Sequence, residues 1–155
     1  MTITAQRPRA ARGARRFGYV VAGAVNIVML YLIHAWPGWD VVPILTDKTT
    51  EVLPYVDASI VATILANAVY VARDDRVAKA CGDLVTNLVS MLSLIRFWQV
   101  FPFDFDGVWA GWQPLTYVLL TLATLGTAIG ALAQVITLFR PVAGPTVRRV
   151  PPGPS

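Results

Sequence analysis

Residues 17–36 read FGYVVAGAVNIVMLYLIHAW and contain no Asp, Glu, Lys or Arg. A bilayer core about 30 Å thick needs roughly 20 mostly apolar residues, because an α-helix rises about 1.5 Å per residue. Apolar residues occupy every face of this stretch, so it lacks the single apolar stripe of a soluble amphipathic helix. The stretch therefore predicts a helix that crosses a membrane.

Three further segments have the same apolar character, over residues 54–72, 77–101 and 114–139. Pro54 suits the first turn of a helix, where a missing N–H costs nothing, and Pro102 ends the third segment. We predict an all-α protein, an integral membrane four-helix bundle of four transmembrane helices with short outer loops and disordered tails.

The composition of the 155-residue chain agrees with this prediction. Hydrophobic residues make up 55% of the chain, charged residues only 14%, and the mean hydropathy is +0.57. Soluble domains usually carry about a quarter charged residues. Disordered chains combine low hydrophobicity with high net charge. The composition therefore argues against a water-soluble globule and against a chain that is disordered throughout.

The basic residues predict the orientation. All but two of the 13 Lys and Arg residues precede the first segment, lie between the second segment and the start of the third, or follow the fourth. The two exceptions are Lys48 and Arg96. Because cytoplasmic loops carry an excess of Lys and Arg, we expect a cytoplasmic membrane location with both termini cytoplasmic (N-in/C-in). The residues on this side are Arg7, Arg9, Arg12, Arg15, Arg16, Arg73, Arg76, Lys79, Arg140, Arg148 and Arg149.

The chain divides into three predicted regions. Residues 1–16 are a basic cytoplasmic tail, 17–140 form the four-span domain, and 141–155 are a Pro-rich cytoplasmic tail. In the first outer loop, residues 47–53 predict a short surface helix that is capped by Thr46 or Asp47.

Polar side chains inside the predicted spans recur near the cytoplasmic ends. Such groups are costly in hydrocarbon, so their positions carry information. One interpretation is a set of hydrogen bonds between helices that fixes their register, and the other is a ligand-binding or transport site. Asp83 is the charged member, which Lys79 or Arg76 can neutralise. The candidate residues are Asn26, Asn67, Asp83, Asn87 and Gln134.

The fourth segment also carries a candidate packing motif. Gly126 and Gly130 form a GxxxG pattern, which allows two helices to approach closely. We expect these two glycines to lie at a helix–helix contact, either within the chain or between copies.

A second polar group lies near the outer face. His34 and Arg96 fall at similar predicted depths, and an outer acid, Asp40, Asp57 or Asp104, is the expected partner of Arg96. The alternative is a shared site for an anionic headgroup or quinone, or a haem ligated by His34.

The sequence lacks the residues that several classes of function require. A single cysteine, Cys81, excludes an internal disulfide or CxxC motif, and a single histidine excludes a multi-histidine metal site. We find no phosphate loop, dinucleotide fingerprint or zincin motif. We therefore predict no metal, no cofactor and no enzymatic activity. The N-terminal arginines suit anionic lipid headgroups, and we expect no nucleic-acid partner.

We predict a small multi-pass membrane protein that is a non-enzymatic accessory or structural subunit. Its expected partners are the lipid bilayer and either a larger membrane protein or another copy of itself. The first alternative is a small transporter or ligand-binding bundle that uses the inner polar residues. The second is a quinone- or haem-linked redox subunit that uses His34 and Arg96.

Overall fold

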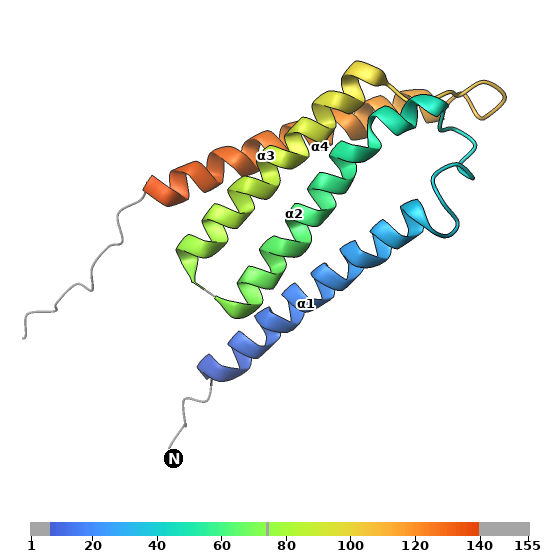
Figure 1. The fold of residues 1–155 in the computed structure, drawn as a ribbon. Helices are drawn as coiled ribbons and strands as arrows, with labels where there is room; N and C mark the ends of the chain where they lie inside the picture. The colour runs from blue at the N-terminus through green and yellow to red at the C-terminus, as the bar shows by residue number, and fades with distance from the viewer. Residues whose placement is uncertain (1–6, 74, 140–155) are drawn as a thin grey trace, which may run out of the picture.

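The computed structural model describes residues 7–73 and 75–139, and the described part is all α-helical apart from its connections (Figure 1). Four long helices are joined by loops, and a single 3₁₀ turn lies in the first long loop. The elements are α1 (Arg7–His34), η1 (Asp47–Glu51), α2 (Leu53–Ala72), α3 (Arg76–Val100) and α4 (Trp112–Phe139).

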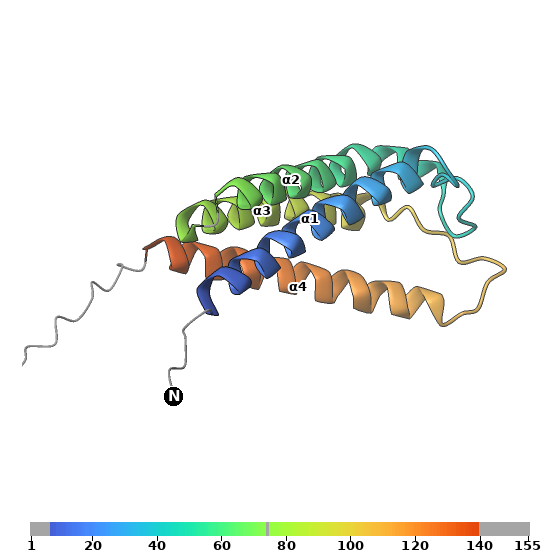
Figure 2. The same cartoon turned by 90° about the horizontal axis from the view of Figure 1, so that it is seen from below.

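The helices pack in the order of the sequence. α1 lies on α2, α2 on α3, and α3 on α4, whereas α1 and α4 form no comparable pair within the described residues. Figures 1 and 2 show this arrangement from two directions. The predicted four-helix bundle is thus confirmed as four helices packed in sequence, not as a ring in which α1 also meets α4. Lipid is as apolar as the helix surfaces, so a membrane protein gains little hydrophobic energy by closing such a ring.

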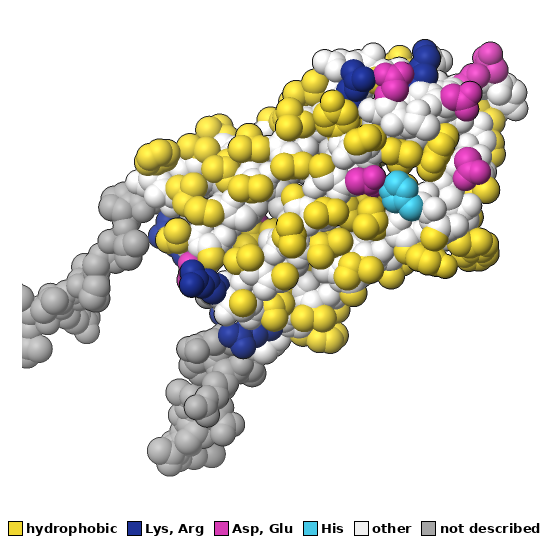
Figure 3. All heavy atoms as spheres, in the orientation of Figure 1, with side chains coloured by type: hydrophobic (Ala, Val, Ile, Leu, Met, Phe, Trp, Pro, Cys, Tyr) yellow, Lys and Arg dark blue, Asp and Glu magenta, His cyan; other side chains and the backbone are white. Residues whose placement is uncertain are grey.

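The four helices are each long and apolar enough to cross a membrane. Figure 3 shows hydrophobic side chains over most of one face, with charged groups gathered at the two ends. Few apolar side chains are buried within the described chain, and many large ones are exposed. A soluble domain would bury these side chains, so the fold suggests a multi-pass membrane protein in contact with a lipid bilayer.

The observed helices match the predicted segments to within two residues, except at the start of α1. This helix begins at Arg7 instead of Phe17, so part of the predicted N-terminal tail is helical. Arg and Ala are good helix formers, which accounts for the extension. The remainder of that tail and the predicted Pro-rich tail lie outside the described residues.

The helix ends follow local signals. Pro54 lies in the first turn of α2, as predicted. At the start of α3, the Asp75 carboxylate accepts a 2.7 Å hydrogen bond from the backbone N–H of Ala78. α3 ends at Val100, its C-cap residue Phe101 has a left-handed φ of 42°, and Pro102 then prevents continuation.

The two long connections meet at one end of the molecule, which we call the loop end. The backbone N–H of Thr46 donates to the carbonyl of Pro102 at 3.0 Å, and that of Asp104 donates to Ile44 at 3.0 Å. The predicted short helix is present as η1. Thr46 occupies its N-cap position, but the Thr46 side chain makes no capping hydrogen bond. The opposite end, where Arg73 and Arg76 join α2 to α3, is called the basic end.

Candidate functional site

Asp83 lies at the centre of a polar cluster near the basic end. One of its carboxylate oxygens lies 2.7 Å from the hydroxyl of Tyr70 on α2, which donates to it. The other lies 3.2 Å from the Lys79 ammonium and accepts a 3.3 Å hydrogen bond from the Gln134 amide on α4. The carboxylate therefore links three helices, and Lys79, one of the two predicted partners, neutralises its charge.

The first helix joins this cluster through an aromatic contact. The rings of Tyr19 on α1 and Tyr70 meet edge to face, with centroids 5.4 Å apart. The Lys79 ammonium lies 5.6 Å from the Tyr19 ring centroid and 4.8 Å from that of Tyr70. Both distances are within the range of a cation–π attraction. All four helices therefore contribute to one group, here called the inner cluster: Tyr19, Tyr70, Lys79, Asp83 and Gln134.

A glycine allows Tyr70 to reach Asp83. A β-carbon at Gly82 would lie 2.8 Å from two ring carbons of Tyr70, closer than real β-carbons approach such atoms. The ring of Tyr70 is buried, with only 4% of the residue exposed. Neither tyrosine was predicted from the sequence as a member of this group. The available signal was a tyrosine in the last turn of one span, followed by a span that carries Gly82 in its second turn.

The other predicted inner residues do not join the cluster. The side-chain amides of Asn26 and Asn67 donate to carbonyls of their own helices, those of Ala22 at 2.9 Å and Thr63 at 2.8 Å. Asn87 lies on α3 against α4, where its amide would lie 3.1 Å from a β-carbon at position 130. Of the five predicted inner residues, the structure therefore brings together Asp83 and Gln134. The three asparagines lie outside the inner cluster.

The two glycines of the GxxxG pattern have different environments. Gly130 faces Asn87 on α3, so its lack of a side chain serves the packing of α3 on α4. A β-carbon at Gly126 would meet nothing within 4 Å in the described chain. Only Gly130 therefore lies at a close helix contact within this structure.

The two outer residues each have a separate carboxylate partner. His34, at the end of α1, lies 2.8 Å from the carboxylate of Asp57 on α2. The guanidinium of Arg96 lies 3.0 Å from Glu51 of η1 and 5.9 Å from the ring centroid of Tyr55. The expected partner of Arg96 was one of three aspartates, and this prediction was wrong because η1 places Glu51 over α3.

Asp57 pairs with His34 and not with Arg96. It lies beyond the first turn of α2, which contains no acidic residue. Its partner is the imidazole of His34, so it ties the outer ends of α1 and α2 together. A carboxylate beside an imidazole can orient it for proton transfer. The described residues contain no group of three or more His, Cys, Asp or Glu that is suited to hold a metal ion.

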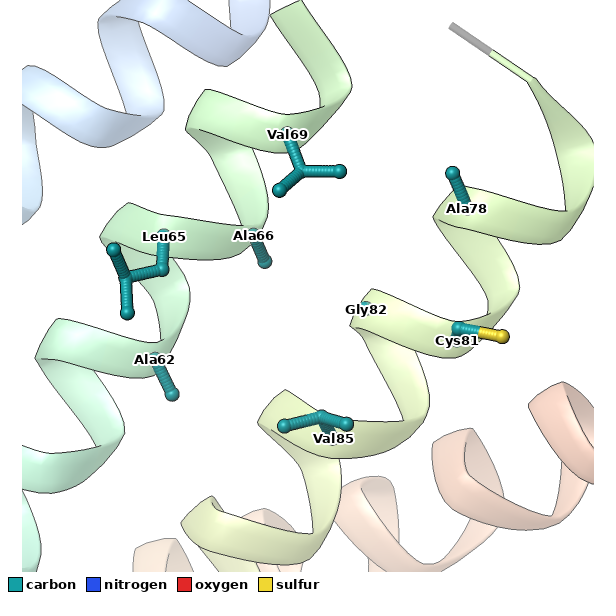
Figure 4. A pocket seen from close by; sticks show the side chains of 8 residues that line it. All are labelled: Ala62, Leu65, Ala66, Val69, Ala78, Cys81, Gly82 and Val85. Atoms are coloured by element: carbon teal, nitrogen blue, oxygen red, sulfur yellow. The ribbon is translucent and has the colours of Figure 1, made fainter. Parts of the chain in front are cut away.

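An apolar groove separates α2 from α3 near the basic end (Figure 4). It has a volume of about 410 Å³, and Ala66, Val69, Gly82 and Val85 are among the residues that line it. Cys81 lies on its α3 side and is exposed. Its walls present almost no polar surface, so it suits a lipid chain better than a polar substrate.

No family model, curated protein or solved structure that we compared with the chain matches it.

Proposed function

We propose that the chain is a non-enzymatic accessory or structural subunit of a cytoplasmic membrane. In this proposal both termini are cytoplasmic, and α4 associates with a second copy of the chain or with a larger membrane protein. The proposal rests on one main observation, the pattern of large apolar side chains on the uncovered face of α4.

Large apolar residues recur on α4 at alternating spacings of three and four. This spacing is the heptad pattern that helices use to pack side by side over long distances. Among the described helices, α3 is the main neighbour of α4, and the contact uses smaller or polar residues such as Thr124, Gly130 and Gln134. The opposite face of α4 is uncovered within the described residues. We call the exposed residues the α4 stripe: Leu115, Val118, Leu122, Leu125, Ile129, Leu132, Ile136 and Phe139.

The inner cluster supports a structural role for the polar residues. Asp83 already has Lys79, Tyr70 and Gln134 as partners, so each of its two carboxylate oxygens is bonded to a group of the same chain. Hydrogen bonds between membrane helices stabilise a bundle by only about 0.6 to 2 kcal/mol each, but they fix which residues face each other. The cluster therefore supports a fixed register for the four helices that presents the α4 stripe outward.

Native mass spectrometry of the chain, extracted with its own lipids, tests the proposal. We expect a homo-oligomer, or a complex with a second polypeptide. Replacing Leu125, Ile129 and Leu132 with alanine should reduce the associated fraction several-fold. The matched control replaces Leu88, Leu92 and Ile95, which are also large and exposed but lie on α3, and it should leave association unchanged.

Two outcomes would contradict the proposal. One is a monomer at every protein-to-lipid ratio, and the other is an oligomer that the α4 and α3 variants affect equally. A monomer that retains a small polar molecule would instead favour the transporter or ligand-binding alternative. In that case, Asp83→Asn should release the molecule.

A further inference from the structure

An apolar belt lies between the basic end and the loop end of the helices. On the face in Figure 3, charged side chains gather at the two ends and leave this belt between them. Its width can be measured along each helix, because an α-helix rises about 1.5 Å per residue. The width matters because it has to match the hydrocarbon core of the membrane, which is about 30 Å thick on average.

The belt is narrow on α1 and α2. On α1 it lies between Arg16 and His34, which are 18 residues and about 27 Å apart. On α2 it lies between Asp57 and Arg73, which are 16 residues and about 24 Å apart. Helix tilt would make the distances across the membrane shorter still.

On α3 the belt lies between Lys79 and Arg96, which are 17 residues and about 26 Å apart. Lys and Arg side chains can widen such a belt by extending toward the lipid headgroups. Here both cations are held by partners in the chain. Lys79 lies 3.2 Å from Asp83, one turn further into the span, and Arg96 lies 3.0 Å from Glu51. Lys79 therefore extends into the belt and does not widen it.

α4 carries no charged residue, but its contacts mark a belt of the same width. Gln134 donates to Asp83 at 3.3 Å, so it lies at the depth of the inner cluster. Tyr117 stacks on Phe101, directly after the end of α3, with ring centroids 4.9 Å apart. Tyr117 and Gln134 are 17 residues and about 26 Å apart. The four helices therefore agree on a width of about 24 to 27 Å.

The groups at the edges of the belt are not enclosed by protein. The side chains of His34 and Asp57 are 44% and 31% exposed, and that of Lys79 is half exposed. Charged and polar groups that face hydrocarbon are costly. His and Asp side chains are also too short to reach a distant headgroup. The hydrocarbon core therefore has to end near these residues.

We propose that the chain is matched to a bilayer whose hydrocarbon core is about 25 Å thick, and that it therefore prefers lipids with short acyl chains. The interaction surface is the apolar belt of all four helices, and the partner is a lipid surface of defined thickness. The preference belongs to the single chain and does not depend on the association of α4 proposed above.

The test uses the full chain in vesicles of phosphatidylcholines with monounsaturated chains of fourteen to twenty-two carbons. Each lipid competes with a brominated lipid that quenches tryptophan fluorescence, and Trp98 on α3 is exposed to report this contact. The relative association constant should be highest for the fourteen- or sixteen-carbon lipid. It should be about two- to fivefold lower for the twenty-two-carbon lipid, because each Å of mismatch costs a fraction of a kcal/mol.

A double variant moves one edge of the belt. His34→Leu with Asp57→Leu removes both partners together, so no group is left unpaired, and the belt extends outward on α1 and α2. The disadvantage of the twenty-two-carbon lipid should become smaller. Asp106→Leu is the matched control, because it removes one carboxylate from the exposed second loop, outside the belt, and should keep the original preference.

Circular dichroism checks that each variant is folded, and the lipid series with the unmodified chain is decisive even if the double variant does not fold. The proposal is overturned if the unmodified chain binds the eighteen-carbon or a longer lipid most strongly, or if its affinity does not vary with chain length. It is also overturned if the folded double variant keeps the original preference.

Discussion

At the scale of single residues, Tyr70 joins three helices. Its hydroxyl lies 2.7 Å from Asp83 and 3.1 Å from the carbonyl of Lys79, and its ring contacts Tyr19. The side chain therefore touches α1 and α3 from its position on α2. Of the two acceptors, the Asp83 carboxylate lies nearer to the hydroxyl.

Removing that hydroxyl should destabilise the protein by about 1 kcal/mol, within the range of hydrogen bonds between membrane helices. We expect Tyr70→Phe to lower the free energy of unfolding in a detergent denaturation titration. Tyr31→Phe is the control, because the Tyr31 side chain is largely exposed on α1. Equal stability of the Tyr70 and Tyr31 variants would show that the inner cluster does not stabilise the fold.

The Arg96–Glu51 pair should contribute much less. The two side chains are 32% and 53% exposed, so water screens their attraction. A double-mutant cycle with Arg96→Gln and Glu51→Gln should give a coupling free energy of about 0.2 to 1 kcal/mol. A coupling of several kcal/mol would mean that this pair is buried in the membrane environment.

At the scale of helices, replacing two glycines with alanine should have different effects on the stability of the fold. A β-carbon at Gly82 would meet the Tyr70 ring and separate α2 from α3, whereas one at Gly126 would meet nothing within the chain. We expect Gly82→Ala to destabilise the fold by about 1 to 3 kcal/mol, as overpacking does.

Gly126→Ala should leave stability unchanged or raise it slightly, since alanine is the better helix former. Both variants are measured in the same denaturation titration. Comparable losses at the two positions would contradict the assignment of Gly82 as the point of close approach. A loss of oligomer in Gly126→Ala alone would place that glycine at a contact between chains.

The sequence predicts the helices better than their contacts. The positions of the spans follow from local signals: segment length, hydropathy, and prolines such as Pro54 and Pro102. The partners of Asp83 depend on how the helices rotate about their axes. A span that is apolar on every face carries no pattern that specifies this rotation. For the same reason, the contact of Arg96 with Glu51 was not predicted, since it depends on the position of η1.

At the scale of the whole molecule, the helices form an open row with α1 and α4 at its two edges. Sequence predicts four spans but not whether they close into a ring. Water provides no driving force within the bilayer, so small differences in side-chain packing decide the arrangement. The open row leaves the α4 stripe available for another helix, and this is the basis of the proposed association.

The proposed topology has four membrane spans and a cytoplasmic basic end. Cysteine labelling in intact cells tests it most directly, in a chain whose natural Cys81 is replaced by alanine. Single cysteines at Lys48 and Asp106 should react with an impermeant maleimide from outside. A cysteine at Arg73 should react only after the cells are permeabilised. Labelling of the Arg73 position in intact cells, or protection of either loop position, would contradict the account.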